Sequence, residues 1–281
     1  MPNLLIKPNT SIARQFHIRP DNVCERCPDW RYVGFDIIKL ETSQSYNDAT
    51  HDTEHLVVVI TGRAQITVSG ESKVYNVGKR STIWEREKAE SLYIPPGRSW
   101  EIKATQPVEV GVCVAPASKG AYPVRHITGS NQPLEARGKG TNTRYVNAIM
   151  MEESQWAESL LVTEVWTPQG NWSSYPAHKH DKDNYPHETY LEETYYHRIN
   201  PSDGYGFQRV YNDDLSLNET MAVYDGDVVL VPEGYHPAGT PYGYDMYYLN
   251  VMAGPVRKWR FQNDPHQEWL FRRDGGKKPG E

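Results

Sequence analysis

The chain has 281 residues, which allows one large domain or two ordinary ones with a substantial buried core. It carries 30 Lys and Arg against 36 Asp and Glu, and this net charge of −6 disfavours binding to nucleic acid or to an anionic membrane. Apolar runs are short, and the start of the chain lacks the apolar stretch of a signal peptide, so we expect a cytoplasmic protein without a membrane-spanning helix.

Short strands account for most of the expected structure. The sequence holds 21 Gly, 20 Pro and 19 Tyr, and its β-rich segments recur at short intervals, bounded by Gly, Pro, Asn and Asp. This spacing is typical of antiparallel sandwiches and barrels, so we predict an all-β protein with few helices. The expected strands are residues 32–40, 56–61, 64–68, 91–94, 100–104 and 108–114, then 160–167, 194–198, 206–211, 220–224, 227–231 and 246–251.

The expected strands fall into two series that look like a loose internal repeat. The sequence SLYIPPG at residues 91–97 parallels VVLVPEG at residues 228–234. Between the two series, residues 118–142 are rich in Gly, Lys, Arg and Asn and poor in apolar periodicity, which indicates a boundary. We predict an N-terminal unit over residues 1–140, a C-terminal unit over residues 141–272, and a disordered tail over residues 273–281.

Histidines concentrate in the second unit, where five of the ten lie between residues 178 and 236. His178 and His180 form a His-x-His pair, which the alternation of a strand can aim at the same side. A first-row divalent ion needs further ligands, and the sequence supplies a carboxylate from the pair Glu192-Glu193 and an imidazole from His236. Two adjacent strands of a small barrel would present these side chains to its interior, so the sequence predicts a metal site there.

The segments that carry these residues resemble the two motifs of the cupin superfamily, namely Gly170…His178-x-His180…Glu193 and Gly226-x5-Pro232-x-Gly234-x-His236. Residues 171–181, 191–197 and 248–255 further resemble the 5-deoxy-glucuronate isomerases of myo-inositol catabolism, a family similar to the 5-dehydro-4-deoxy-glucuronate ketol-isomerases of pectin breakdown. The resemblance is dense over residues 160–269 and thinner in the first half. It implies an all-β bicupin, two antiparallel β-barrel or jelly-roll units with one metal centre. It also implies a cytoplasmic aldose–ketose isomerase that converts 5-deoxy-D-glucuronate to 2-deoxy-5-keto-D-gluconate.

Three neutral imidazoles and one carboxylate suit one divalent transition metal ion, Zn, Mn, Fe, Co or Ni, without choosing among them. In the cupin pattern the carboxylate ligand directly precedes a short aromatic strand, which favours Glu193 because Thr194-Tyr195-Tyr196 follows it. Glu192 would face the opposite side of the strand, although a slip of one residue would exchange the two. The predicted metal ligands are His178, His180, Glu193 and His236.

An aldose–ketose isomerase must carry a proton between two carbons, unless a metal-assisted hydride shift replaces the proton path. Tyr195 and His197 share a strand face with Glu193, so they are candidates to line the cavity. His197 is a candidate proton carrier because its reference pKa lies near neutrality, and hydrogen-bonded scaffold is the alternative. Tyr248 is a further catalytic candidate, with packing as its alternative role.

A uronate substrate carries a carboxylate, which requires an Arg or Lys, ideally one that binds in a bidentate fork. Arg209, on an expected core strand, is the predicted partner, and Lys179 and Arg144 are alternatives. The cations that flank Trp259 are expected in a surface or subunit contact: Arg257, Lys258 and Arg260.

The first unit lacks the histidine pattern that predicts a metal site in the second unit. Its turn at residues 95–100 has no His where His236 stands, and His51 and His55 lack the His-x-His spacing. We expect this unit to be metal-free and to pack, to close one end of the pocket, or to form an oligomer interface. The expected partners are therefore a small-molecule uronate and, through such an interface, further copies of the chain in a homo-oligomer.

Two functions of other classes remain open. A metal-dependent cupin dioxygenase would use the same three-His-one-Glu centre with iron and oxygen. A non-catalytic sugar-binding cupin would tolerate the loss of ligands. The polar cavity candidates favour a sugar substrate, and the retention of all four ligands favours catalysis.

Overall fold

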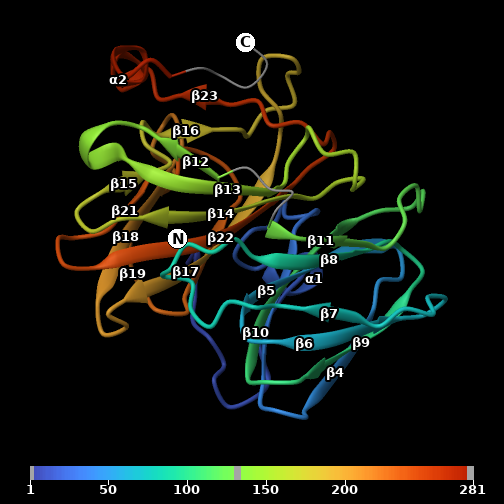
Figure 1. The fold of residues 1–281 in the computed structure, drawn as a ribbon. Coiled ribbons are helices and arrows are strands. Elements are labelled where there is room, and N and C mark those ends of the chain that lie inside the picture. The colour runs from blue at the N-terminus through green and yellow to red at the C-terminus, as the bar shows by residue number, and fades with distance from the viewer. Residues whose placement is uncertain (1–2, 130–133, 277–281) are drawn as a thin grey trace.

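Almost all of the regular structure is antiparallel strand (Figure 1), which confirms the all-β prediction. The structure is a computed structural model and describes residues 3–129 and 134–276. Its helical elements include α1 (Pro20–Val23), the 3-10 turn η2 (Gly140–Asn142) and α2 (Glu268–Arg273). Across the described ranges, no helix has the length and apolar character needed to cross a bilayer.

Residues 14–127 form two sheets that enclose an apolar core. The larger sheet has the strand order β11-β8-β5-β10-β3-β2, and the smaller has the order β4-β9-β6-β7. Both β6 and β9 alternate buried and exposed residues, because one face packs on the core and the other meets solvent. The bounds are β2 (Arg14–Ile18), β3 (Gly34–Leu40), β4 (Ser45–Ala49), β5 (Thr53–Thr61), β6 (Ala64–Val68), β7 (Tyr75–Val77), β8 (Glu90–Ile94), β9 (Ser99–Ala104), β10 (Val108–Pro116) and β11 (Arg125–Ile127).

The second half of the chain repeats this arrangement. Its larger sheet has the order β1-β20-β17-β22-β14-β13-β12, its smaller sheet the order β15-β21-β18-β19, and β16 pairs with β23. The bounds are β1 (Leu5–Ile6), β12 (Leu134–Arg137), β13 (Arg144–Met150), β14 (Leu161–Thr167), β15 (Trp172–Ser173), β16 (His178–Lys179), β17 (Glu192–Asn200), β18 (Tyr205–Tyr211), β19 (Asn218–Tyr224), β20 (Val228–Val231), β21 (Ala238–Gly239), β22 (Asp245–Ala253) and β23 (Gln262–Asn263).

Two strands from residues 1–140 belong to the larger sheet of the second unit rather than to a sheet of the first unit. β1 pairs with β20, and β12 pairs with β13. The strand pairing therefore divides the chain differently from the predicted boundary at residue 140. In the tail predicted to be disordered, Arg273 is the last residue of α2, and Asp274 N–H donates to Leu270 O at 3.0 Å. Residues 277–281 of that tail lie outside the described residues.

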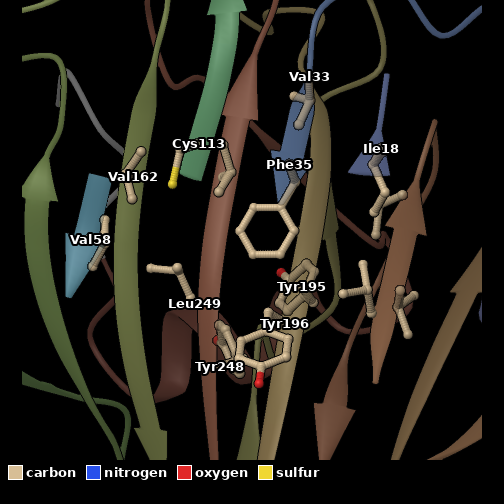
Figure 2. Close-up of a cluster of buried hydrophobic side chains, with 14 of the residues drawn as sticks. Ile18, Val33, Phe35, Val58, Cys113, Val162, Tyr195, Tyr196, Tyr248 and Leu249 are labelled. Carbon is tan, nitrogen blue, oxygen red and sulfur yellow. The ribbon is translucent and has the colours of Figure 1, made fainter. Parts of the chain in front are cut away.

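The larger sheets of the two units face each other across a shared apolar core (Figure 2). Phe35 and Val58 from the first unit and Val162 and Leu249 from the second are all fully buried in it. At Gly111 the sheets approach so closely that a Cβ atom would lie 2.6 Å from Leu249 Cδ2. The two units are therefore joined by one continuous core.

Two buried glutamates at equivalent places of the repeat tie each unit to the other. Glu54, near the start of β5, accepts the backbone N–H groups of residues 158–160, just before β14, at 2.7 to 2.8 Å. Glu192, at the start of β17, accepts those of residues 31–33, just before β3, at 2.5 to 2.9 Å. Bonds from backbone N–H to an ionised carboxylate are about twice as strong as neutral ones, so these two contacts stabilise the pairing of the units.

His55 occupies in the first unit the place that Glu193 occupies in the second. His55 stands opposite Ile94, just before the Pro-Pro-Gly turn, and Glu193 stands opposite Val231, just before the Pro-Glu-Gly turn. The His55 ring is buried, and its Nδ1 accepts a hydrogen bond from Trp100 Nε1 at 3.2 Å. A neutral, hydrogen-bonded histidine therefore fills the position that holds a carboxylate in the second barrel.

Acid is expected to destabilise the fold through His55. Burial is the main reason that its pKa falls from 6.5 to about 3, whereas the unfolded chain takes up the proton near its ordinary pKa. Below about pH 6.5 the unfolded state then binds more protons, and the free energy of unfolding drops by up to about 1.4 kcal/mol per pH unit from this residue. His55→Gln keeps an acceptor for Trp100 without titrating, so urea unfolding between about pH 6.5 and 4.5 should give a correspondingly flatter slope. Identical slopes in the two proteins would contradict this account.

Candidate metal centre and cavity

The alternation of β17 sends its side chains to two different faces. Glu192 binds residues 31–33 of the first unit, and Tyr196 OH donates to Glu109 Oε1 at 2.7 Å. Glu193 and Tyr195 therefore point the other way, into the barrel of the second unit. The structure places Glu193, and not Glu192, inside that barrel.

Three histidines converge beside Glu193. His178 lies in β16, His180 follows it, and His236 follows the turn after β20. One ring nitrogen of each lies within 4.8 Å of the others. Gly234 makes the turn possible, because its φ is +84° and a Cβ there would lie 2.4 Å from Tyr211 O.

Backbone carbonyls fix the tautomers of two of these histidines. His180 Nδ1 lies 3.0 Å from Leu191 O, and His236 Nδ1 lies 2.8 Å from Gly234 O. A carbonyl oxygen only accepts, so both Nδ1 atoms carry a proton, and in the neutral ring Nε2 then presents a lone pair. Both Nε2 atoms lie 3.0 Å from the same oxygen, Glu193 Oε2.

The protonation states of Glu193 and His178 suit ligand roles. Burial raises the pKa of Glu193, but the neighbouring His236 and His180 outweigh it and hold that pKa well below its usual range. Burial, followed by His236 and His180, lowers the pKa of His178 well below 6.5. Asn250 Nδ2 donates to Glu193 Oε1 and orients the carboxylate. At neutral pH the centre thus holds an ionised carboxylate and a neutral His178 imidazole.

Two tyrosines line the wall next to this centre. Tyr195 OH lies 2.9 Å from Ser174 Oγ, and Tyr248 OH accepts a hydrogen bond from Ser173 Oγ at 2.9 Å. Burial raises the pKa of both phenols, so both remain protonated at neutral pH. They are hydrogen-bond donors rather than bases.

His197, a predicted catalytic candidate, lies behind Tyr195. Its ring stacks on the Tyr195 ring with centroids 5.9 Å apart, and Nε2 lies 2.8 Å from Gln208 Oε1. Burial lowers the pKa of His197 to about 4. Its side chain is fully buried and lines neither cavity of the second unit described below, so the structure supports the scaffold alternative.

Arg209, the predicted carboxylate partner, points away from the barrel interior. Its guanidinium stacks 3.9 Å above the Tyr211 ring, and Nε donates to Asn218 Oδ1 at 3.0 Å. Neighbouring Gln208 takes the inward face of β18 instead, because successive side chains of a strand alternate. The structure therefore contradicts the prediction for Arg209, because the side chain that faces the barrel interior is that of the preceding residue, Gln208.

Two adjoining cavities open beside the centre. The inner one, of about 60 Å³, is lined by His178, Glu193, Tyr195, Tyr248 and Asn250 among others. The outer one, of about 780 Å³, shares part of its lining with the inner cavity. The shared residues are Arg137, Arg144, Met151, His178 and Trp259. A small molecule that enters the outer cavity can therefore reach His178.

A family model and several relatives match nearly the whole chain. The model of the KduI/IolB family matches residues 5–270. The chain belongs to this family. A Geobacillus kaustophilus protein named 5-deoxy-glucuronate isomerase is 52% identical over 242 residues, which cover 86% of this chain and 87% of the relative. A protein of the same name from Shouchella clausii is 44% identical over 274 residues, covering 97% of this chain and 100% of the relative.

Solved structures share the fold of this KduI/IolB family member. An IolB-like protein from Salmonella typhimurium LT2 matches with a TM-score of 0.90 and 45% identity, covering 95% of this chain and 99% of that one. An oxalate decarboxylase from Bacillus subtilis matches with a TM-score of 0.64 at 12% identity, covering 99% and 85%. The second likeness concerns the fold alone. The predicted bicupin architecture is confirmed.

The donor atoms of the centre fit a divalent ion in this family member. His236 Nε2 is buried and has no hydrogen-bond partner in the described part of the chain. It faces Glu193 Oε2, and two acceptors 3.0 Å apart repel each other unless a proton or a metal cation lies between them. Nitrogen and carboxylate donors are the usual ligands of first-row divalent ions.

Several cavity residues were not predicted from the sequence, among them Asn250, Arg137 and Trp259. Asn250 shares a strand face with Tyr248, so alternation in β22 was a usable signal for it. Arg137 lies in a segment that contributes to the family resemblance and that received no site role, and only the cations that flank Trp259 were given a place, in a surface or subunit contact. Of the cations beside Trp259, Arg257 instead donates to the carbonyls of Met151, Ser154 and Leu160, and Arg260 pairs with Glu152.

Proposed function

We propose that this KduI/IolB family member converts 5-deoxy-D-glucuronate to 2-deoxy-5-keto-D-gluconate, with one divalent transition metal ion held by His178, His180, Glu193 and His236. The observation that carries the proposal is the convergence of three imidazole nitrogens and one carboxylate beside two adjoining cavities, the outer of which is large enough for a sugar acid. The relatives' shared name supports the substrate.

The chemistry divides between the ion and the protein. A bound divalent ion supplies Lewis acidity, which polarises the substrate carbonyl and its neighbouring hydroxyl and contributes several kcal/mol. Tyr248 accepts from Ser173, so its own O–H is available to donate to a substrate oxygen in the inner cavity. Tyr195 lies next to it and is held by Ser174. The two phenols orient the sugar, and their raised pKa values keep them from removing its protons.

We also propose that the protein acts in the cytoplasm. Cys24, Cys27 and Cys113 are all free thiols, which accords with a reducing compartment. Zn, Mn, Fe, Co and Ni all suit the ligand set, and assembly into a homo-oligomer stays a prediction.

The direct test is turnover of purified protein with 5-deoxy-glucuronate, followed by proton NMR. We expect the ketose to appear, chelation by EDTA to stop the reaction, and one of the five ions to restore it. In deuterated water, label at the carbon that gains hydrogen indicates proton transfer, and its absence indicates a hydride shift. Oxygen uptake with the substrate would instead establish a dioxygenase, and sugar binding without turnover would establish a binding protein.

A further inference from the structure

Arg144 is a cation of the cavity wall without a carboxylate partner. Its Nη1 donates to Asn142 O at 3.2 Å and to Tyr175 O at 3.4 Å, and in the described residues no carboxylate lies within 4.0 Å of its guanidinium. Two other guanidiniums with low exposure, those of Arg80 and Arg198, pair with Glu164 and Glu109, whereas that of Arg257 donates to three backbone carbonyls. Arg144 has neither arrangement, because its hydrogen bonds to the described residues both come from Nη1.

A second arginine makes the placement of the Arg144 charge still less favourable. Arg137 stands directly opposite Arg144 in the pairing of β12 with β13. Like charges directly opposite each other in adjacent strands are destabilising. Glu135 balances Arg137, with contacts of 2.9 Å to Nε and 2.8 Å to Nη2, and nothing comparable balances Arg144. Burial is the main cause that lowers the pKa of Arg144, and Arg137 adds to it.

Both arginines line the inner cavity together with His178 and Glu193. Arg137, Arg144 and His178 also line the outer cavity, so the guanidiniums and this candidate ligand face the same space. A ligand that spans the two cavities would meet His178 and Glu193 and, at the same time, a guanidinium without a carboxylate partner. An open-chain uronate has this bifunctional form, with an aldehyde at one end and a carboxylate at the other.

We propose that Arg144, next to Arg137, binds the carboxylate of the substrate and makes the site specific for a uronate over a neutral sugar. This inference rests on the proposed isomerase function. A carboxylate bound here balances the positive charge of Arg144 on the cavity wall. A guanidinium can hold it through two parallel N–H bonds. Arg137 is already engaged by Glu135, so Arg144 provides the main contact.

The test compares a charged and a neutral substrate in variants of Arg144. The substrates are 5-deoxy-glucuronate and 5-deoxy-glucose, which has a hydroxymethyl group in place of the carboxylate. We expect Arg144→Gln to lower kcat/KM for the uronate by about 100-fold, mainly through KM, and to leave that for the neutral sugar within about threefold. Arg144→Lys should retain part of the preference, because it supplies a charge without the fork.

Controls separate specificity from folding. Arg63→Gln removes an exposed arginine between β5 and β6 of the first unit and should leave both substrates unchanged. Metal content and thermal unfolding of Arg144→Gln should match the parent. If this variant loses activity equally on both substrates with intact metal content, the carboxylate assignment is overturned.

A binding measurement keeps this inference distinct from the isomerase proposal. Calorimetry with D-glucuronate and its neutral amide needs no turnover. We expect the parent to prefer the acid and Arg144→Gln to show no preference. A parent that prefers the acid but isomerises nothing would end the isomerase proposal and leave the carboxylate site standing. A parent with no preference would end the carboxylate site.

Discussion

Replacing His236 with alanine is expected to lower kcat for 5-deoxy-glucuronate by about 1,000-fold or more. The variant removes one of three imidazoles that converge within 4.8 Å. Lewis-acid stabilisation contributes several kcal/mol, and about 4 kcal/mol corresponds to a factor of about 1,000 in rate. The same loss is expected for His178→Ala and His180→Ala. Initial rates at saturating substrate and added metal measure it.

His187→Ala is the matched control for these variants. His187 is an exposed histidine of the loop between β16 and β17, on the same stretch of chain as His178 and His180. It is expected to keep the parent's kcat within about twofold, since surface substitutions have small effects. If His236→Ala turned over at the rate of His187→Ala, the histidine cluster would not take part in the reaction.

Replacing Glu192 with glutamine is expected to lower the free energy of unfolding by about 3 kcal/mol. Glutamine keeps one acceptor oxygen, and its NH₂ group would face backbone N–H groups of residues 31–33 that now bond to a carboxylate. A hydrogen bond to a charged group contributes about 1.5–3 kcal/mol, and an unpaired buried donor costs about 1–3 kcal/mol. Glu54→Gln should have a similar effect through residues 158–160.

Urea unfolding at about pH 8 measures this loss, since burial raises the pKa of Glu192 and the carboxylate must be ionised. Glu101→Gln makes the same chemical change at an exposed position of β9 and should shift stability by less than about 0.5 kcal/mol. Equal midpoints for Glu192→Gln and Glu101→Gln would mean that these buried carboxylates do not hold the units together.

Apart from β13, every described strand of six or more residues was predicted from sequence. All twelve expected strands are present, and β6 has the predicted bounds of residues 64–68. Several are longer than expected, as β17 is, because polar residues at its ends, Glu192 among them, are buried by contacts with distant segments. The missed strands include β1, β16 and β23, which have two residues each and show no period in the sequence.

The centre was predictable because its residues lie close together in motifs, whereas the cavity wall was not. His178, His180 and His236 follow a recognisable spacing, and the alternation of β17 distinguishes Glu193 from Glu192 once the strand register is known. Arg144 becomes significant only through its pairing with Arg137 and its lack of a carboxylate neighbour. Such facts depend on tertiary packing, which local sequence patterns do not encode.

Elemental analysis of the purified protein, with turnover measured on the same sample, tests the central claim most directly. We predict about one divalent transition metal ion per chain in the parent and in His187→Ala, and nearly none in a variant that lacks His178, His180 and His236. Activity should fall in proportion to metal content as the ion is removed. A parent protein that is free of metal and isomerises 5-deoxy-glucuronate at full rate would contradict the account.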